Sequence, residues 1–290
     1  MIEFCGLRVG HPVINASGCF DAVAAASVFG EELWEQFPFA AYVSKTITFG
    51  AREGNPPPRL WEAASGLINS IGLPNRGLHA YLDTDLPALS RLQVPLITNV
   101  MGSTPAQVGE LVAALERQPQ VAAVELNVSC PNVATGLDIG ADPAGLEQLL
   151  LHVRPLTSKP LIVKLTPNTA DVAACAAGAQ AGGADAVSLI NTLRAMALAP
   201  DHTGPWLGGG SGGLSGPAIR AVALAQVSAV ARAVDIPIVG MGGVASGRDA
   251  SEMLEAGATL VAVGTESFRD PAAGSRIARE LAHGFTQNGR

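Results

Sequence analysis

The sequence has little of what marks nucleic-acid-binding, secreted or membrane proteins. Charged residues make up only 15% of its 290 residues, the net charge is −7, and lysines and arginines form no cluster. Because phosphate backbones require a basic surface, we expect no nucleic-acid partner. No apolar run reaches the roughly 18 residues of a membrane-spanning helix, and the first residues are not typical of a signal peptide. We therefore expect a cytoplasmic protein without a membrane partner.

Cysteine is also scarce: the chain holds Cys5, Cys19, Cys130 and Cys175. No two of them form a Cys-x-x-Cys pair, so we expect no metal site in this chain. Free thiols fit a reducing compartment, and most cysteines act as small apolar residues, which is how we interpret Cys5, Cys19 and Cys175. Cys130 differs, because it lies among polar residues just after a strand-like run, where nearby lysines would favour its reactive thiolate.

Apolar residues are abundant, at 48% of the chain, and they alternate between two patterns. Short apolar runs predict eight strands: Val13–Ala16, Ala41–Thr46, Pro95–Val100, Ala122–Val128, Leu161–Thr166, Ala186–Asn191, Ile236–Met241 and Leu260–Gly264. Helix-like stretches follow them at residues 22–35, 76–91, 104–117, 143–156, 169–182, 217–233, 246–256 and 271–284. Eight such units predict an α/β fold, a closed (β/α)8 TIM barrel, rather than an open doubly wound sheet.

We expect one domain spanning residues 1–290, with additions at both ends of the barrel. Residues Ile2–His11, before the first strand, predict a small hairpin that plugs the bottom of the barrel. Two long insertions, at 47–75 and 192–215, follow the second and sixth strands. Both lie at the carboxyl ends of strands, where barrel enzymes keep their active sites, so we interpret them as binding loops.

Polar residues and glycines gather at the ends of the predicted strands, which meet at one mouth of a barrel. They are Ser17, Lys45, Thr46, Asn99, Asn127, Ser129, Cys130, Lys164, Asn191, Thr192, Gly242, Gly243, Gly264 and Thr265. Lysines and asparagines are costly in an apolar barrel unless they have partners, so we expect a polar ligand. The glycine turns after the seventh and eighth strands predict a phosphate site built from backbone N–H groups.

Several segments together resemble the class 1 dihydroorotate dehydrogenases, in order and over nearly the whole chain. They are Val43–Thr48 (VSKTIT), Asn55–Arg59 (NPPPR), Ile68–Asn75 (INSIGLPN), Asn127–Asn132 (NVSCPN), Ile190–Thr192 (INT), Gly212–Ile219 (GGLSGPAI) and the two late glycine turns. The resemblance implies a barrel that binds FMN and oxidises (S)-dihydroorotate to orotate in pyrimidine biosynthesis. Cys130 would be the base that takes the C5 proton, and flavin N5 would take the hydride from C6.

The resemblance also assigns binding residues, position by position. FMN would be held by Ser17, Lys45, Thr46, Asn99, Asn127, Lys164, Ile190, Gly216, Gly242, Gly243, Gly264 and Thr265. The substrate would be held by Lys45, Asn69, Ser70, Ile71, Gly72, Leu73, Asn127, Asn132, Asn191 and Thr192. Lys45 would also offset negative charge during catalysis, and residues 131–141 would form a lid.

Within class 1, residues Asn191–Arg194 and Gly213–Gly216 look most like class 1B. That class passes electrons to NAD through a separate subunit that carries FAD and a 2Fe–2S cluster, which implies a homodimer joined to that subunit as a heterotetramer. Residues Arg52–Pro56 and Gly72–Asn75 also resemble the fumarate-using class 1A. The sequence departs from the family pattern at three places. Asp21 stands where the family usually has glycine, and Ala195 stands at the glycine of the usual Leu-Arg-Gly-Met. Residues Gly136–Gly140 differ from the common lid pattern.

Three other functions remain open from the residues alone. The barrel could be another FMN reductase acting on a pyrimidine or a uridine in RNA, although the acidic charge speaks against RNA. It could be a non-catalytic barrel that only binds a nucleotide or a partner, although Lys45, Cys130 and Lys164 are all present. It could also be a flavin-free aldolase or isomerase, which a colourless purified protein would favour.

Overall fold

The computed structural model describes residues 1–128 and 138–284, and its centre is a barrel of parallel strands. The eight strands are β3 (Val13–Asn15), β4 (Tyr42–Val43), β8 (Leu96–Met101), β9 (Val121–Asn127), β10 (Leu161–Lys164), β11 (Ala186–Leu189), β14 (Ile238–Met241) and β15 (Leu260–Val263). Their order in the sheet runs β3-β15-β14-β11-β10-β9-β8-β4, and every neighbouring pair is parallel. Because the end strands β3 and β4 contact each other, the sheet closes into the predicted barrel.

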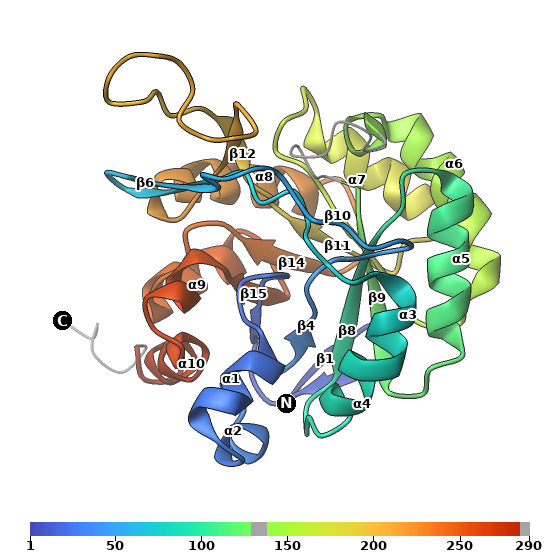
Figure 1. Cartoon of the computed structure of the whole chain (residues 1–290). Helices are drawn as coiled ribbons and strands as arrows, with labels where there is room; N and C mark the ends of the chain where they lie inside the picture. The colour runs from blue at the N-terminus through green and yellow to red at the C-terminus, as the bar shows by residue number, and fades with distance from the viewer. Residues whose placement is uncertain (129–137, 285–290) are drawn as a thin grey trace.

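Helices surround the barrel between successive strands, as Figure 1 shows. They are α1 (Ala22–Phe29), α2 (Glu32–Glu35), α3 (Gly77–Ala80), α4 (Leu86–Leu89), α5 (Pro105–Glu116), α6 (Pro143–Val153), α7 (Val172–Ala181), α8 (Arg220–Ala231), α9 (Gly247–Glu255) and α10 (Ala273–His283). A π-helical turn, η1 (Tyr81–Asp85), joins α3 to α4. Each stretch predicted to be helical therefore contains helix, although 217–233 begins with a 3₁₀ turn, η4 (Pro217–Ile219), before α8.

Local capping explains where two of these helices begin. The Thr104 hydroxyl accepts a hydrogen bond from the Gln107 N–H at 3.2 Å, and Pro105 occupies the first turn of α5. The Asp142 carboxylate likewise accepts from the Ala144 N–H at 3.1 Å at the start of α6. A capping side chain followed by proline satisfies or removes N–H groups that would otherwise lack partners.

The inside of the barrel is filled by small and branched apolar side chains. They include Ile14, Val43, Ile97, Ala123, Ile162, Ala186, Val239, Leu260 and Ala262. The predicted N-terminal hairpin is confirmed as β1 (Ile2–Phe4) paired antiparallel with β2 (Leu7–Val9). Phe4 and Val9 are buried in the same cluster, so the hairpin closes one end of the barrel. The open end, at the carboxyl ends of the strands, is left for ligands.

The two long insertions form more structure than the predicted loops. β6 (Leu60–Ala63) and β7 (Gly66–Asn69) come from the first, and β12 (Leu193–Ala195) and β13 (Gly212–Ser215) come from the second. They pair antiparallel in the order β12-β13-β7-β6, which is called the roof sheet below. In Figure 1, β6 and β12 lie at the end of the barrel away from the N-terminus.

Two further details complete the description of the fold. β4 is shorter than predicted and ends at Val43, so Lys45 and Thr46 follow it, and β5 (Ile47–Thr48) then pairs with β8. Within residues 1–128 and 138–284, no helix has both the length and the apolar character needed to cross a membrane.

Candidate active site

A cavity of about 650 Å³ lies between the carboxyl ends of the barrel strands and the roof sheet. Its volume falls in the range of about 300–1,000 Å³ that is typical of small-molecule sites. Ala16 and Lys45 come from the barrel side, and Leu67 and Asn69 come from the roof sheet. The cavity is therefore built from segments that are far apart in the sequence.

Most residues that the sequence assigned to ligands line this cavity. Of those expected to hold FMN, the wall contains Ser17, Lys45, Thr46, Asn127, Lys164, Ile190, Gly216, Gly242, Gly243, Gly264 and Thr265. Of those expected to hold the substrate, it contains Lys45, Asn69, Ile71, Gly72, Leu73, Asn127, Asn191 and Thr192. Cys130, Asn132 and the expected lid up to residue 137 lie outside the described residues.

Asn99 and Ser70 lie behind the wall rather than on it. Asn99 is fully buried, and its Nδ2 donates to Glu125 Oε2 at 2.5 Å. Asn99 Oδ1 has no hydrogen-bond partner within the described part of the chain. The Ser70 hydroxyl is also buried and accepts a hydrogen bond from Asn55 Nδ2 at 2.9 Å. Both side chains therefore bond to residues that, like them, are not part of the cavity wall.

Two lysines place positive charge at the bottom of the cavity. Lys164 ends β10 and is 6% exposed, whereas Lys45 follows β4 and is an exposed residue of the cavity wall. Partial burial nevertheless lowers the pKa of Lys45 from 10.5, and Arg59 adds to this, while Asp21 and Cys19 oppose it. These cations can balance the charge of an anionic ligand in the cavity.

Glu125 is a buried acid that sequence reasoning missed. It lies in the middle of β9, is 4% exposed, and accepts hydrogen bonds from Asn99 and, at 2.7 Å, from the Ser188 hydroxyl. Two residues further along β9, Asn127 Nδ2 donates to the Thr46 hydroxyl at 3.3 Å. The sequence did contain a signal for Glu125: it is a single acid inside the apolar run 122–128, and buried acids are rare unless they are paired.

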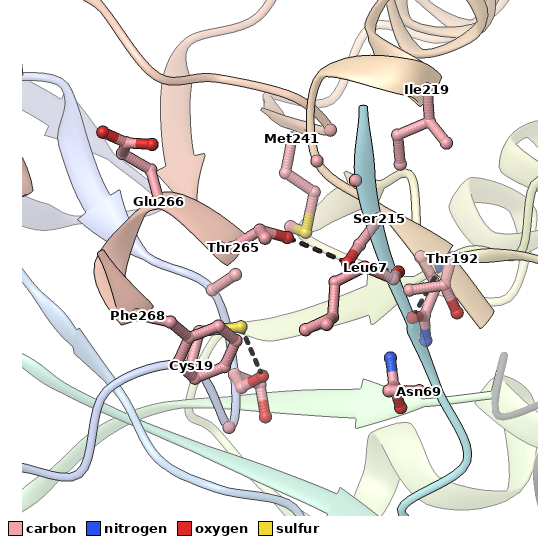
Figure 2. A pocket seen from close by; sticks show the side chains of 18 of the residues that line it. Cys19, Leu67, Asn69, Thr192, Ser215, Ile219, Met241, Thr265, Glu266 and Phe268 are labelled. Atoms are coloured by element: carbon pink, nitrogen blue, oxygen red, sulfur yellow. Dashed lines mark hydrogen bonds between the residues drawn. The ribbon is translucent and has the colours of Figure 1, made fainter. Parts of the chain in front are cut away.

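Glycines with positive φ shape another part of the cavity wall. Gly216, Gly242 and Gly243 have φ values of +89°, +126° and +73°, which favour glycine. A Cβ at Gly243 would come within 2.9 Å of the Gly216 carbonyl oxygen, so these turns are tightly packed. The Thr265 hydroxyl donates to the Ser215 hydroxyl at 2.9 Å, which joins the eighth barrel unit to the roof sheet (Figure 2).

Among the described residues, Cys19 is the cysteine that lines the cavity, and the sequence suggested that it is inert. Its Sγ lies 3.8 Å from the Ser17 carbonyl oxygen (Figure 2). Burial raises the pKa of this thiol, and Lys164 and Lys45 only partly counteract that effect. A protonated thiol is a poor nucleophile, so Cys19 acts as part of the apolar wall.

The roof sheet, and the segment that leads into it from β11, supply amides and a hydroxyl to the cavity. Asn69 Nδ2 donates to the Gly213 carbonyl at 3.3 Å, across the β7–β13 pair. The Thr192 N–H donates to Asn191 Oδ1 at 2.8 Å, so two neighbouring polar residues hold each other in place. Figure 2 shows Asn69 and Thr192 on the same side of the cavity, opposite Phe268.

Comparison with known proteins agrees with this geometry. The family model for dihydroorotate dehydrogenase matches residues 1–285. The chain belongs to the dihydroorotate dehydrogenase family. It is 43% identical to a "Dihydroorotate dehydrogenase B (NAD(+)), catalytic subunit" of Citrifermentans bemidjiense, over 97% of this chain and 91% of the relative. Proteins of the same name from Pelobacter propionicus and Geobacter sulfurreducens are each 42% identical over 99% of this chain, and over 94% and 93% of their own lengths.

The family match confirms the resemblance seen in the motifs, but the motifs did not reveal every residue at the cavity. The wall residues that were not assigned to a ligand include Cys19, Leu60, Glu62, Leu67, Ser215, Ile219, Met241, Glu266, Phe268 and Arg269. Ser215 and Ile219 lie inside the motif Gly212–Ile219, and Glu266 directly follows the last expected residue, Thr265. Leu60, Glu62 and Leu67 lie in an insertion that was expected to bind ligand, so the available signal for these residues was their position in or beside segments already singled out.

Proposed function

We propose that this chain, as a single domain of residues 1–290, is an FMN-dependent catalytic subunit that oxidises (S)-dihydroorotate to orotate. The observation that carries the proposal is the arrangement around one cavity: two lysines at the barrel end, glycine turns on one wall, and side-chain amides from both the strand ends and the roof sheet. A family match over residues 1–285 supports the same activity. The proposed reaction belongs to pyrimidine biosynthesis, and we propose that the protein works in the cytoplasm.

The cavity fits FMN in size and in chemistry. Gly264 gives the clearest observation, because among the described residues a Cβ there would meet only Cys19 Sγ at 3.6 Å and Ala16 Cβ at 3.7 Å. Ordinary packing of the chain therefore does not require glycine at this position, whereas close approach of a ligand to the backbone does. With Gly243 it would hold the phosphate, and Lys164 would face the flavin ring. When bound, FMN would supply the redox chemistry by accepting the hydride of the substrate.

The substrate would lie between the flavin and the roof sheet. The amides of Asn69, Asn127 and Asn191 can each donate and accept, which matches the alternating N–H and C=O groups of a pyrimidine ring. The Lys45 ammonium would balance the substrate carboxylate and any charge that develops in the reaction. Covered by the roof sheet, the site would exclude water while the substrate reacts.

We assign the base to Cys130, which would remove the proton from C5 of dihydroorotate. The assignment rests on the segment Asn127–Asn132 and on the position of Asn127, which ends β9 at the cavity. Cys130 is three positions after Asn127, and a fully extended chain spans about 10 Å over three positions. Lys45 at the same mouth would favour the thiolate form of that cysteine.

A separate electron-transfer subunit is part of the proposal. The relatives are named catalytic subunits of an NAD(+)-linked enzyme, which implies a further subunit in those enzymes. We propose that this chain forms a homodimer and joins a subunit carrying FAD and a 2Fe–2S cluster as a heterotetramer. Co-expression with the cognate subunit should then confer NAD reduction on the complex, and NAD reduction at the background rate would contradict this step.

An anaerobic absorbance spectrum before and after addition of dihydroorotate tests the main proposal. A yellow protein whose band near about 450 nm bleaches would support both the flavin and the substrate. A yellow protein that does not bleach, alone or with its partner subunit, would contradict the substrate. A colourless protein that cannot be reconstituted with FMN would contradict the flavin, and with it the proposed function.

A further inference from the structure

Arg276 on α10 connects the two glycine turns from outside the cavity. Its Nη1 donates to the Ala245 carbonyl at 3.1 Å, in the turn that follows β14. Its Nη2 donates to Glu266 Oε1 at 2.9 Å, in the turn that follows β15. Ala245 and Glu266 both line the cavity. One guanidinium therefore holds both turns from which a phosphate would receive its backbone N–H groups.

A carboxylate network orients this guanidinium. Arg276 Nε donates to Asp270 Oδ2 at 2.8 Å, and Nη1 also donates to Glu280 Oε1 at 3.0 Å. The other oxygen of Glu280 accepts the Gly247 N–H at 2.7 Å, at the beginning of α9. Because each edge of the planar guanidinium has a fixed partner, its position is determined by α9, α10 and the turn after β15 together.

The Glu266 carboxylate would repel an anionic ligand in the cavity, and the positive charge of Arg276 offsets this repulsion. The residue lies at the cavity immediately after Thr265, one of the positions expected to hold the phosphate. Figure 2 shows its carboxylate pointing away from Ser215 and Leu67, which face the centre of the cavity. The ion pair with Arg276 offsets the carboxylate charge and holds it in this orientation. Without the arginine, a negative charge would be left beside the phosphate.

We propose that Arg276 is a positioning residue for the FMN phosphate: it fixes the turns after β14 and β15 and keeps the Glu266 carboxylate away from the ligand. It does this through Ala245 and Glu266, without contacting the phosphate itself. The inference rests on the proposed FMN site and adds a residue that no motif identified. It predicts an effect on the phosphate end of the cofactor and little effect on the ring end.

Comparison of FMN with riboflavin isolates the effect on the phosphate end of the cofactor, because riboflavin has the same ring and ribityl chain but no phosphate. The dissociation constant of each flavin is measured by fluorescence quenching on the full chain after reversible removal of bound flavin. We expect Arg276→Gln to weaken FMN binding by about tenfold or more, and to change riboflavin binding by less than about twofold. Arg276→Lys should lie between, since it keeps the charge but loses the planar fork.

Two further variants separate the charge effect from general damage. Arg279→Gln removes an arginine of the same helix whose Nε bonds only to the Ser275 carbonyl of that helix among the described contacts, and it should leave both affinities unchanged. Glu266→Gln combined with Arg276→Gln should recover part of the FMN affinity, because the repelling charge is gone. Riboflavin binding by each variant also reports whether the cavity is still folded.

The possible outcomes distinguish this inference from the proposed function. Loss of FMN and riboflavin affinity in equal measure would show a purely structural role for Arg276 and overturn the inference. Unchanged affinities would also overturn it. If the unaltered protein binds neither flavin, the proposed function fails first, whereas a wild-type preference for FMN that disappears in Arg276→Gln supports both.

Discussion

The side-chain amide of Asn15 makes two hydrogen bonds to the backbone of Val43. Its Nδ2 donates to the Val43 carbonyl at 2.7 Å, and its Oδ1 accepts the Val43 N–H at 2.8 Å. Asn15 ends β3 and Val43 ends β4, the two strands at the ends of the sheet order. The amide therefore replaces the backbone pairing that the last two strands of the barrel lack at this point, and Lys45 follows two residues later.

We expect Asn15→Ala to destabilise the barrel at this seam. The change leaves the buried N–H and C=O of Val43 without partners, which should lower the free energy of unfolding by about 2–4 kcal/mol. Urea denaturation monitored by circular dichroism measures this loss. Ile14→Val, a neighbouring interior change, serves as the control and should cost about 0.5–1.5 kcal/mol. A loss for Asn15→Ala no larger than that of the control would show that the seam does not depend on the amide.

Asp21, one of the departures from the family pattern, has a structural role as a helix cap. Its Oδ1 accepts hydrogen bonds from the N–H groups of Val23 at 3.1 Å and Ala24 at 3.0 Å, at the start of α1. Asp21→Ala should lower the free energy of unfolding by about 1 kcal/mol, whereas Asp21→Gly should cost only a few tenths. Equal losses in the two variants, measured by urea denaturation, would contradict the capping role.

Much of the barrel could be predicted because its signals are local. Strands buried on both faces appear as short apolar runs, and the polar residues that end them must meet at one mouth, which placed Lys45, Lys164 and Asn127 together. The predicted hairpin at residues 2–11 followed from its short apolar segments before the first strand. These features need only the sequence of the segment itself and the regular order of the fold.

The features that could not be predicted depend on contacts between distant segments. Asn69 pairs with Gly213 in the roof sheet, and no local pattern in either insertion specifies that partner. Asn15 lies inside an apolar run, where its role becomes visible only when β4 closes the barrel. Arg276 resembles any arginine of an amphipathic helix until the turns after β14 and β15 are placed beside it.

The pH dependence of stability should include a contribution from Glu280. Burial alone would raise the pKa of this carboxyl, but the Gly247 N–H and Arg276 overcome it, so the pKa lies below 4.5. A lowered folded-state pKa means that the stabilisation is complete above the unfolded-state value and is lost as the pH falls through the folded-state value. Unfolding by urea between about pH 6 and about pH 3 should therefore show a smaller loss for Glu280→Gln than for the wild type. Parallel pH profiles of the two proteins would reject this contribution.

The proposed base can be tested without disturbing the flavin site. Cys130→Ala should retain FMN, because the resemblance gives Cys130 no contact with the cofactor, and should lower the rate of flavin reduction by dihydroorotate by about 10²-fold or more. Stopped-flow absorbance under anaerobic conditions measures that rate. Cys5→Ala, in the hairpin at the closed end of the barrel, is the matched control and should react at the wild-type rate. An unchanged rate in Cys130→Ala would assign the base to another residue.

Gly264 tests whether the cavity wall is shaped for a ligand or for the protein. A methyl group at this position would make only ordinary contacts with Cys19 and Ala16, so we expect Gly264→Ala to fold. The same methyl group would occupy the space where the ligand approaches the backbone, and FMN binding should weaken by about tenfold or more. Flavin retained after gel filtration and the apparent melting temperature measure the two effects separately. Gly10→Ala, whose Cβ would meet nothing within 4 Å, is the control and should change neither. Full FMN retention by Gly264→Ala would show that the ligand does not approach this turn, and the phosphate would then have to be placed elsewhere in the cavity.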